Sequence, residues 1–159
     1  AMEALLSSGF DLAFASMSPA VEDLESLRRM CACSRSWCMI DRFLEERDDV
    51  KAEVFRAMGR DVRDDPHNEA DRMKLLWDLL WEEGYCPQME VHALEETFEL
   101  DSDALLKRYE RCFQDCGDGE RARVREILQA RSENGLIRND VHILKGTLYW
   151  DVRVKRHYR

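Results

Sequence analysis

The segment at residues 75–98, LLWDLLWEEGYCPQMEVHALEETF, constrains the fold more than any other part of the chain. Leucine and tryptophan cover more than half of the circumference of a helix over residues 73–81. Such a helix must be central in its fold or covered by a partner. Gly84 ends this helix, and Pro87 begins a second helix that extends to residue 98. The sequence therefore predicts a helix–turn–helix unit at the centre of the protein.

The composition favours a helical, globular chain. The 159 residues are 45% hydrophobic and 36% charged, which suits one folded domain better than a disordered segment. Only three prolines and seven glycines occur, and this scarcity favours long helices over a turn-rich β fold. We expect residues 2–159 to form one single-core, all-α bundle of about six to eight helices. Ala1 before Met2 is set aside as a cloning remnant.

Helical spacing of apolar residues predicts further helices on both sides of the central unit. Ser18 and Pro19 suit the start of a helix that continues through residue 31. The other segments expected to be helical are 5–14, 38–58 as one long helix or two, 101–116 with Asp101 as its N-cap, 120–133 and 139–144. Residues 60–72 are almost all polar, which indicates a connector within the domain.

The basic segment 148–159 has two interpretations. Leu148, Trp150, Val152 and Val154 alternate with polar or tyrosine residues, a pattern typical of a strand. No second segment of equal quality offers a pairing partner. We therefore expect a helical or extended basic tail, and a strand remains the alternative.

Charge and hydropathy restrict the partners and the location. The net charge of −9 disfavours nucleic-acid binding by the body of the protein, although the basic tail could contact phosphate. No apolar run approaches the ~20 residues that a membrane span needs, and the N-terminus lacks the pattern of a signal peptide. We expect a cytoplasmic protein, with a nuclear location as the alternative, and reduced cysteines.

The cysteines and histidines give no recognisable catalytic or metal motif. Cys31, Cys33 and Cys38 have the spacing C-x-C-x4-C, which lacks the second ligand pair of a structural zinc site. Cys112 and Cys116 continue an apolar helical stripe and are expected to be buried thiols. We expect no cofactor and no enzymatic activity. A small helical metal-binding protein or enzyme that uses the cysteines is the alternative.

The order of these segments resembles the death-effector domain, the six-helix member of the death fold. VEDLESLRRMC at residues 21–31 resembles the second helix of that family, and residues 75–111 resemble its later helices. The similarity covers roughly residues 4–113 and is closest to small adaptors and viral inhibitors of the caspase pathway. The charged-triad motif of the family is not matched, because Asp101–Leu105 contains no arginine. Arg108 or Arg28 could rebuild it.

The resemblance implies a non-enzymatic module that docks on protein partners through helix surfaces and regulates apoptosis-type signalling. Acidic residues on one helix would steer a basic partner patch. Trp81 could anchor an interface, since tryptophan is enriched at hot spots. The residues expected to contact a partner are Glu22, Asp23, Glu25, Arg28, Trp81, Asp103 and Arg108. The sequence does not define the partner or the oligomeric state.

Overall fold

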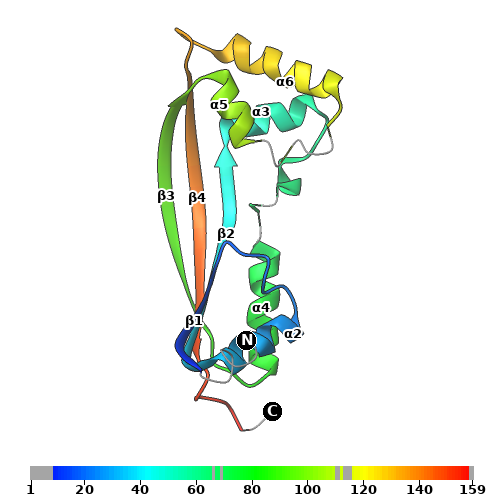
Figure 1. Ribbon diagram of the computed structural model, residues 1–159. Helices are drawn as coiled ribbons and strands as arrows, with labels where there is room; N and C mark the ends of the chain where they lie inside the picture. The colour runs from blue at the N-terminus through cyan, green and yellow to red at the C-terminus, as the bar shows by residue number, and fades with distance from the viewer. Residues whose placement is uncertain (1–8, 66, 69, 110–111, 113–115, 158–159) are drawn as a thin grey trace. The chain divides into compact units, whose positions relative to one another are not determined.

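The protein has a mixed α/β fold, and the all-α prediction is wrong. The computed structural model describes residues 9–65, 67–68, 70–109, 112 and 116–157 (Figure 1). The elements in chain order are β1 (Phe10–Ser16), α2 (Leu24–Cys33), β2 (Ser34–Asp48), α3 (Asp49–Ala57), η1 (Val62–Asp64), α4 (Ala70–Glu82), β3 (Gln88–Leu100), α5 (Ser102–Arg108), α6 (Asp118–Arg131) and β4 (Ile137–Asp151). The six-helix bundle that the family resemblance implies is therefore wrong as well.

The strands form a four-stranded mixed sheet with the order β1-β2-β4-β3. Strand β1 is parallel to β2, and α2 connects them as the crossover that parallel neighbours need. Strand β4 runs antiparallel to β2, because Asp41 contacts Thr147 near one end and Asp48 contacts Asn139 near the other. Contacts of Tyr149 with Gln88 and of Thr97 with Asp140 show the same opposed direction for β3 and β4.

The chain divides into two compact units, and each of the strands β2, β3 and β4 contributes one portion to each unit. The first unit comprises residues 1–45, 69–92 and 144–159, and the second comprises residues 46–68 and 93–143. In the first unit α2 and α4 cover one face of the sheet portion (Figure 1). The buried side chains of this core are Val21, Leu27, Met30, Cys38, Ile40, Met73, Leu76, Leu80, Tyr85, Leu148 and Trp150.

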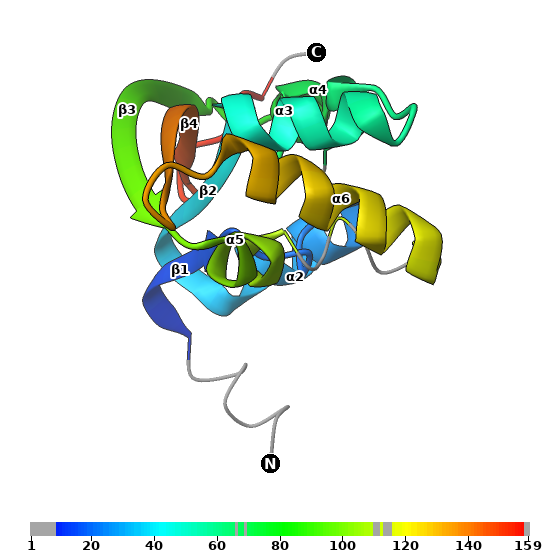
Figure 2. The ribbon, with the colours of Figure 1, turned by 90° about the horizontal axis from the view of Figure 1, so that it is seen from above.

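The second unit has its own core, built by α3, α5 and α6 with the neighbouring ends of the strands. Figure 2 shows these helices from above. The buried side chains of this core are Val50, Val54, Leu105, Tyr109, Cys116, Val124, Leu128 and Ile137. No helix among the residues that the structure describes is long and apolar enough to cross a membrane.

Several predicted helices are strands. Residues 10–14 of the helix expected over 5–14 belong to β1, which continues to Ser16, and residues 5–8 lie outside the described part. The segment 38–58 combines most of β2 with α3, and the helix expected after Pro87 is β3. The helix expected over 139–144 lies within β4, so the strand alternative for the C-terminal segment is right as far as Asp151. The reasons differ between the strands: β1 is apolar on both faces, nearly all of β3 is exposed, and in β2 the buried Asp41 and Arg42 interrupt the alternation.

Other elements are confirmed. Helix α4 contains the predicted segment 73–81 and is followed by Gly84, which has a φ of 89°. Asp101 is the N-cap of α5, where its carboxylate accepts a hydrogen bond from the backbone N–H of Ala104 at 2.8 Å, but α5 ends at Arg108, well before the expected end at residue 116. Helix α6 contains most of the helix expected over 120–133.

Candidate functional site

Strand β1 forms an edge of the sheet and exposes its large apolar side chains. Phe10, Leu12 and Phe14 are 48%, 49% and 55% exposed. Because they alternate along the strand, they point to one face of the sheet. Leu12 lies beside the half-exposed Trp37 of β2, whose ring centroid is 6.3 Å from that of Tyr149 on β4. We call this surface the aromatic face, and it consists of Phe10, Leu12, Phe14, Trp37 and Tyr149.

The aromatic face is opposite to the face that α2 and α4 cover. Cys38 and Ile40 of β2, whose side chains point the other way from Trp37, are buried in the core with these helices. The smaller residues of β1, Ala13 and Ala15, pack against the same core. The first unit therefore has one covered sheet face and one apolar face that no described helix of this unit covers.

Buried polar groups fix the loop that follows β1. The guanidinium of Arg42 donates through Nη2 to the carbonyl oxygens of Ser18 and Val21, at 2.9 and 2.7 Å. Asp41 of β2 accepts hydrogen bonds from Ser16 at the end of β1 and from Thr147, at 3.3 and 3.1 Å. Its carboxylate also pairs with Lys145 at 2.6 Å. The carboxyl end of β1 is thus held in one defined position.

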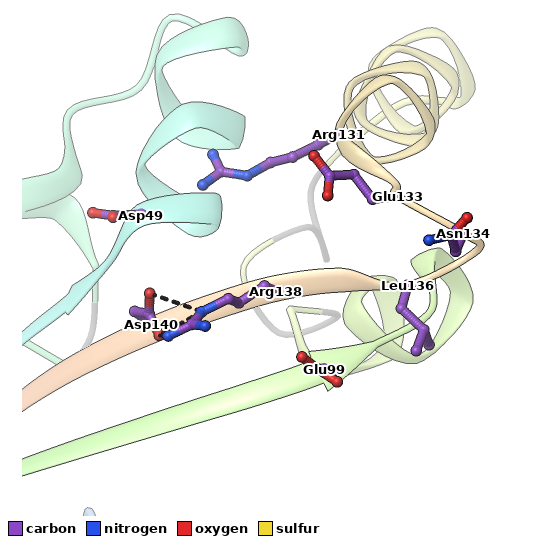
Figure 3. A pocket seen from close by; sticks show the side chains of 8 residues that line it. All are labelled: Asp49, Glu99, Arg131, Glu133, Asn134, Leu136, Arg138 and Asp140. Atoms are coloured by element: carbon purple, nitrogen blue, oxygen red, sulfur yellow. Dashed lines mark hydrogen bonds and ion pairs between the residues drawn. The ribbon is translucent and has the colours of Figure 1, made fainter.

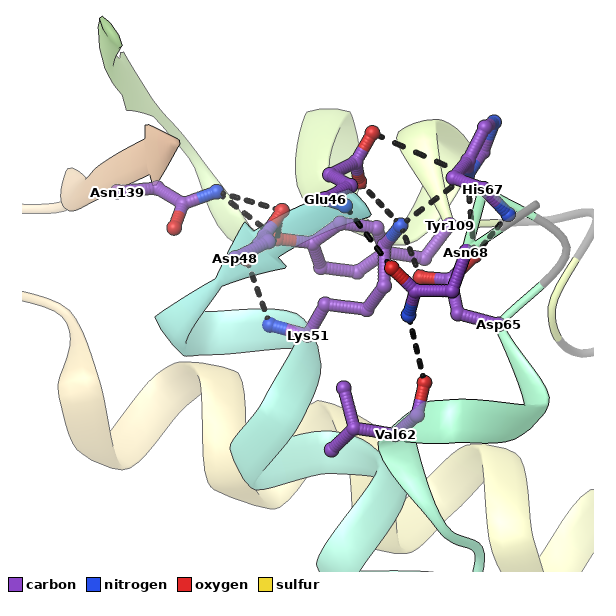
Figure 4. Close-up of polar contacts among 9 residues, drawn as sticks. All are labelled: Glu46, Asp48, Lys51, Val62, Asp65, His67, Asn68, Tyr109 and Asn139. Atoms are coloured by element: carbon purple, nitrogen blue, oxygen red, sulfur yellow. Dashed lines mark hydrogen bonds and ion pairs between the residues drawn. The ribbon is translucent and has the colours of Figure 1, made fainter. Parts of the chain in front are cut away.

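A buried ionic cluster lies in the second unit (Figure 4). The ammonium of Lys51, on α3, donates to Glu46 and lies 2.7 Å from Asp65 Oδ2 and 3.4 Å from His67 Nδ1. The Lys51 side chain is only 4% exposed. Burial alone lowers the pKa of Lys51, but its hydrogen bonds to Asp65 and Glu46 outweigh burial and raise it. The cluster is therefore a charged structural network inside the core.

The cluster has the donor set of a metal site but its centre holds an ammonium group. Glu46, Asp65 and His67 place one ligand atom each within 4.8 Å of one another. Lys51 contacts all three of these residues, so a cation would have to displace a buried lysine. The residues fit an ion-pair cluster better than a metal. Asp65 and His67 fall in the segment that the sequence indicates as a polar connector, and no spacing points to them.

A second buried network adjoins the first through the chain at β2 and α3. The hydroxyl of Tyr109 donates to the carboxylate of Asp48 at 2.9 Å, and Asn139 Nδ2 donates to both groups at 3.1 and 3.0 Å. Asp48 is also the N-cap of α3, since Oδ1 accepts from the backbone N–H of Lys51 at 2.8 Å. Burial, followed by the neighbouring Asp48 charge, raises the pKa of Tyr109. Tyr109 therefore remains a neutral donor that fixes the start of α3.

A pocket of about 550 Å³ opens beside α6 and the start of β4 (Figure 3). Its lining is mostly charged: Asp49, Glu99, Arg131, Glu133, Asn134, Leu136, Arg138 and Asp140. Both arginines are already paired, Arg131 with Glu53 at 2.6 Å and Arg138 with Asp140 at 3.3 Å. The acidic groups exceed the arginines. The pocket consequently offers neither a free cationic site nor the apolar lining typical of small-molecule sites.

The cysteines that the alternative metal-binding interpretation would use differ in their burial. Cys38 is buried in the core of the first unit, and Cys31 and Cys33 on α2 are half-buried. Among the described residues these thiols form no group of three metal donors. Cys116 is buried as the sequence predicts, and burial raises the pKa of the half-buried Cys112.

The acidic residues predicted to bind a partner already have contacts within the protein. Glu22 pairs with Arg72 at 2.8 Å, and Glu25 pairs with Arg29 at 3.2 Å. Asp23 is the N-cap of α2, which begins at Leu24 rather than at Ser18, and forms a capping box with Ser26. These side chains stabilise α2 and its surroundings before any partner is considered.

The remaining predicted residues are also engaged in local contacts. Arg28 forms two hydrogen bonds with Glu83, and Trp81 stacks under the guanidinium of Arg156 at 3.8 Å from its ring centroid. Trp81 is nevertheless 44% exposed. Asp103 and Arg108 belong to the second unit, where Arg108 stacks on Phe98 at 4.3 Å. The predicted residues therefore do not form one surface of one unit.

The scan against models of protein families and the search of curated proteins both find no match for this chain.

Proposed function

We propose that this chain supplies one half of a doubly wound α/β domain that binds a small molecule of the nucleotide class. A further parallel strand, from a polypeptide segment outside residues 1–159, pairs with the free edge of β1. The observation that carries the proposal is β1 itself. It is a parallel edge strand of apolar sequence, FDLAFAS, whose three largest side chains are about half exposed.

The exposure of β1 conflicts with its apolar sequence. In all-parallel sheets helices cover both faces and the strands are nearly continuous runs of apolar residues, and β1, which pairs in parallel with β2 within a mixed sheet, has such a sequence. Edge strands that face solvent normally carry charges, prolines or bulges that prevent pairing. β1 carries one such charge, Asp11, which pairs with Arg35 at 3.2 Å, and its register with β2 shifts between Phe10 and Leu12, whereas residues 12–16 have neither a charge nor a register shift. A parallel strand followed by a helix would pair with the free edge and cover the aromatic face.

The position of a ligand follows from the direction of winding. The connection from β1 through α2 to β2 leads the chain away from the free edge of β1. A strand added at the free edge would lie on the other side of β1 from β2, so the order of the strands would reverse direction at β1. Doubly wound sheets bind nucleotides outside the carboxyl ends of the strands where this direction reverses. That place is the loop Ser16–Pro19, which Arg42 holds in position. The nucleotide class of the ligand is inferred by analogy of fold, from what other doubly wound sheets bind.

The pairing of β1 with a further strand can be tested on the natural polypeptide that contains this sequence. We would purify it from its source, measure its intact mass and follow hydrogen exchange in β1. We expect a mass above 18.7 kDa and slow exchange along β1, in contrast to fast exchange on the free edge of the isolated chain. A native polypeptide of 18.7 kDa, or a dimer joined by antiparallel β1 strands, would overturn the proposal.

Titration of the same native protein with ATP and NAD, followed by amide NMR, tests the ligand. We expect chemical-shift changes concentrated at the amides of Ser16, Met17 and Ser18, with the amides of α6 as the internal reference. Chemical-shift changes spread evenly over the amides, or no changes with either nucleotide, would refute nucleotide binding. The proposal of strand pairing would remain.

A non-enzymatic interaction module is the second candidate, favoured by the same exposed edge. In this case a separate protein would add its strand to β1, since Glu22 before α2 and Glu25 within it are already paired. A native polypeptide of 18.7 kDa that loses a defined partner on Leu12→Lys would support this function. A role in apoptosis-type signalling and a cytoplasmic location stay predictions of this alternative.

A further inference from the structure

We infer that the free edge of β3, over residues 93–100, binds a peptide segment that adds to the sheet as a further strand. This segment carries basic side chains on one face and apolar side chains on the other. Strands β1 and β3 are the two opposite edges of the sheet, so the site is separate from the β1 edge and goes beyond the proposed function. Residues 93–100 belong to the second unit.

The outer edge of β3 has no strand partner among the described residues. The strand comprises Gln88–Leu100 and pairs with β4 alone, so a row of backbone N–H and C=O groups faces away from the sheet. All of its residues up to Thr97 are exposed, on both faces. The strand contains no proline or glycine that would hinder pairing. The edge is therefore a template for one more strand.

One face of residues 93–100 is acidic. Thr97 donates to Asp140 Oδ1 on β4 at 2.7 Å, and Glu95 and Glu99 point to the same face because they lie two positions away on either side. Glu95 lies 3.5 Å from His142 Nδ1, a counter-charge only when the imidazole is protonated. Glu99 has no ion pair with a described residue. We call the surface of Glu95, Thr97 and Glu99 the acidic face.

The pocket beside α6 borders the acidic face. Glu99 lines this pocket together with Asp140 (Figure 3). The acidic groups of the lining exceed its two arginines, Arg131 and Arg138, and both arginines are already paired. A lysine or arginine opposite Glu99 on an added strand would bring its positive charge to this lining. The pocket thus favours a basic side chain at that position of the partner.

The opposite face of the segment is mainly apolar. Leu94 is 42% exposed, and Phe98 is half-buried with the guanidinium of Arg108 at 4.3 Å from its ring centroid. Apolar side chains of an added strand would cover Leu94 and the accessible part of Phe98. Because Arg108 already supplies a positive charge on this side, the basic side chains of the partner belong on the acidic face.

The charge of the segment excludes a second copy of this chain as the occupant. Residues 93–100, ALEETFEL, contain three glutamates and no lysine or arginine. Two such strands side by side would place glutamates opposite or diagonal to one another, and like charges across a strand pair are destabilising. A basic strand meets the same carboxylates with the opposite charge, which stabilises the pair. The partner is therefore a basic amphipathic strand.

The fluorescein-labelled peptide KVKVKVKV is the probe, because it alternates basic and apolar side chains. We would titrate it into the folded chain, follow fluorescence anisotropy, and record hydrogen exchange of the backbone amides with and without the peptide. We expect saturable binding and slower exchange at those amides of residues 93–100 that do not bond to β4. Exchange along β1 should not change.

A control peptide separates strand addition from attraction between charges alone. KPKPKPKP has the same charge, but it cannot form a strand because every second residue lacks the backbone N–H. It should bind more weakly than KVKVKVKV and should not slow exchange at residues 93–100. Equal affinity of the two peptides would overturn the inference.

Matched variants of the protein test the acidic face. Glu95→Gln together with Glu99→Gln should weaken binding of KVKVKVKV about tenfold, because two favourable charge pairs across the strands are lost. Either single variant serves if the double variant does not fold. Glu25→Gln together with Glu82→Gln removes the same charge from exposed helix positions of the first unit and should leave the affinity nearly unchanged.

Three results would overturn the inference. The first is equal weakening by the two double variants, which would show that only the net charge matters. The second is slower exchange along β1 in place of residues 93–100. The third is the absence of saturable binding up to about 1 mM KVKVKVKV, which corresponds to a binding free energy too small for a specific site.

Discussion

Lys51 and Asp65 form an ion pair inside the second unit, with 2.7 Å between Nζ and Oδ2 and with side chains that are 4% and 1% exposed. Glu46 is the second carboxylate on the same ammonium group. Two carboxylates therefore share one buried positive charge. The half-exposed His67 lies between this cluster and the solvent. The arrangement makes this unit sensitive to the loss of any one of these charges.

Lys51→Met should destabilise the protein by about 3–5 kcal/mol, because it leaves two buried carboxylates without a counter-charge. Urea unfolding at pH 7 measures the change. Lys74→Met is the control, since Lys74 forms a pair with Asp78 on the exposed surface of α4, and its unfolding midpoint should hardly move. The triple variant Lys51→Met, Glu46→Gln, Asp65→Asn should recover part of the loss, and no recovery would contradict the charge explanation.

Asp65→Asn should remove an acid-dependent component of stability. Burial alone raises the pKa of Asp65, but hydrogen bonds from His67 and Lys51 outweigh it and lower the pKa to about 2. The unfolded chain then binds the proton more tightly, so this contribution is complete above pH 4 and is lost as the pH falls toward 2. The wild type should lose about 2 kcal/mol more than the variant across this window. Acid unfolding monitored by circular dichroism measures it.

Asp61 offers the matched comparison for this pH effect. Its pKa is also lowered to about 2, first through its hydrogen bond with Arg63, but the Asp61–Arg63 pair is solvent-exposed. Solvent screening weakens such a pair. Asp61→Asn should therefore leave the acid unfolding curve close to that of the wild type, and equal effects of the two substitutions would argue against a role for burial.

Tyr109→Phe should cost about 1–3 kcal/mol, because Asp48 then loses a hydrogen bond that it cannot replace from solvent. The loss should concentrate in α3, whose N-cap is Asp48. Hydrogen exchange of the first amides of α3, together with the unfolding free energy, measures both effects. Tyr149→Phe removes an exposed hydroxyl and should change neither quantity.

Leu12→Lys should leave the unfolding free energy of the isolated chain within about 0.5 kcal/mol, since the side chain is already half exposed. It should also suppress association through the β1 edge, because a lysine there opposes strand pairing. Static light scattering over a concentration series shows the second effect. Leu75→Lys, at an equally exposed site on α4, should not reduce association.

The helices that the sequence predicts best are those with both a cap and an apolar stripe. Asp101 and Gly84 mark helix ends in the structure as in the sequence, and α4 and α6 show helical periodicity on one face. The strands are missed because exposure does not follow polarity: β3 exposes Met89, Val91 and Leu94, whereas β2 buries charges. In β2, Asp41 and Arg42 are buried next to Ile40, so the period of two is not visible. Only the partners of these charges, far away in sequence, make the strand stable.

The buried clusters could not be predicted for the same reason. Glu46, Lys51 and Asp65 have no spacing that distinguishes them from the many solvated charges of this chain. In the sequence, Tyr109 falls within the helix expected over 101–116, and Asn139 falls at the start of the helix expected over 139–144. They meet Asp48 only because β4 pairs with β2. Local patterns carry information on caps and turns, whereas these networks depend on strand pairing over long separations.

Asp23→Ala should loosen the start of α2, because the Asp23 carboxylate accepts the backbone N–H of Ser26 at 2.8 Å and also binds the Ser26 hydroxyl. The hydrogen bond with Ser26 also holds the Asp23 pKa below its ordinary value. The cap should therefore weaken as the pH falls toward this lowered pKa and below it. We expect faster hydrogen exchange at Ser26 and Leu27, while Asp23→Asn, which keeps an acceptor, should preserve slow exchange. Glu22→Ala, which removes only the exposed pair with Arg72, should leave α2 unchanged. Faster exchange with Glu22→Ala but not with Asp23→Ala would show that charge, rather than the cap, holds the helix start.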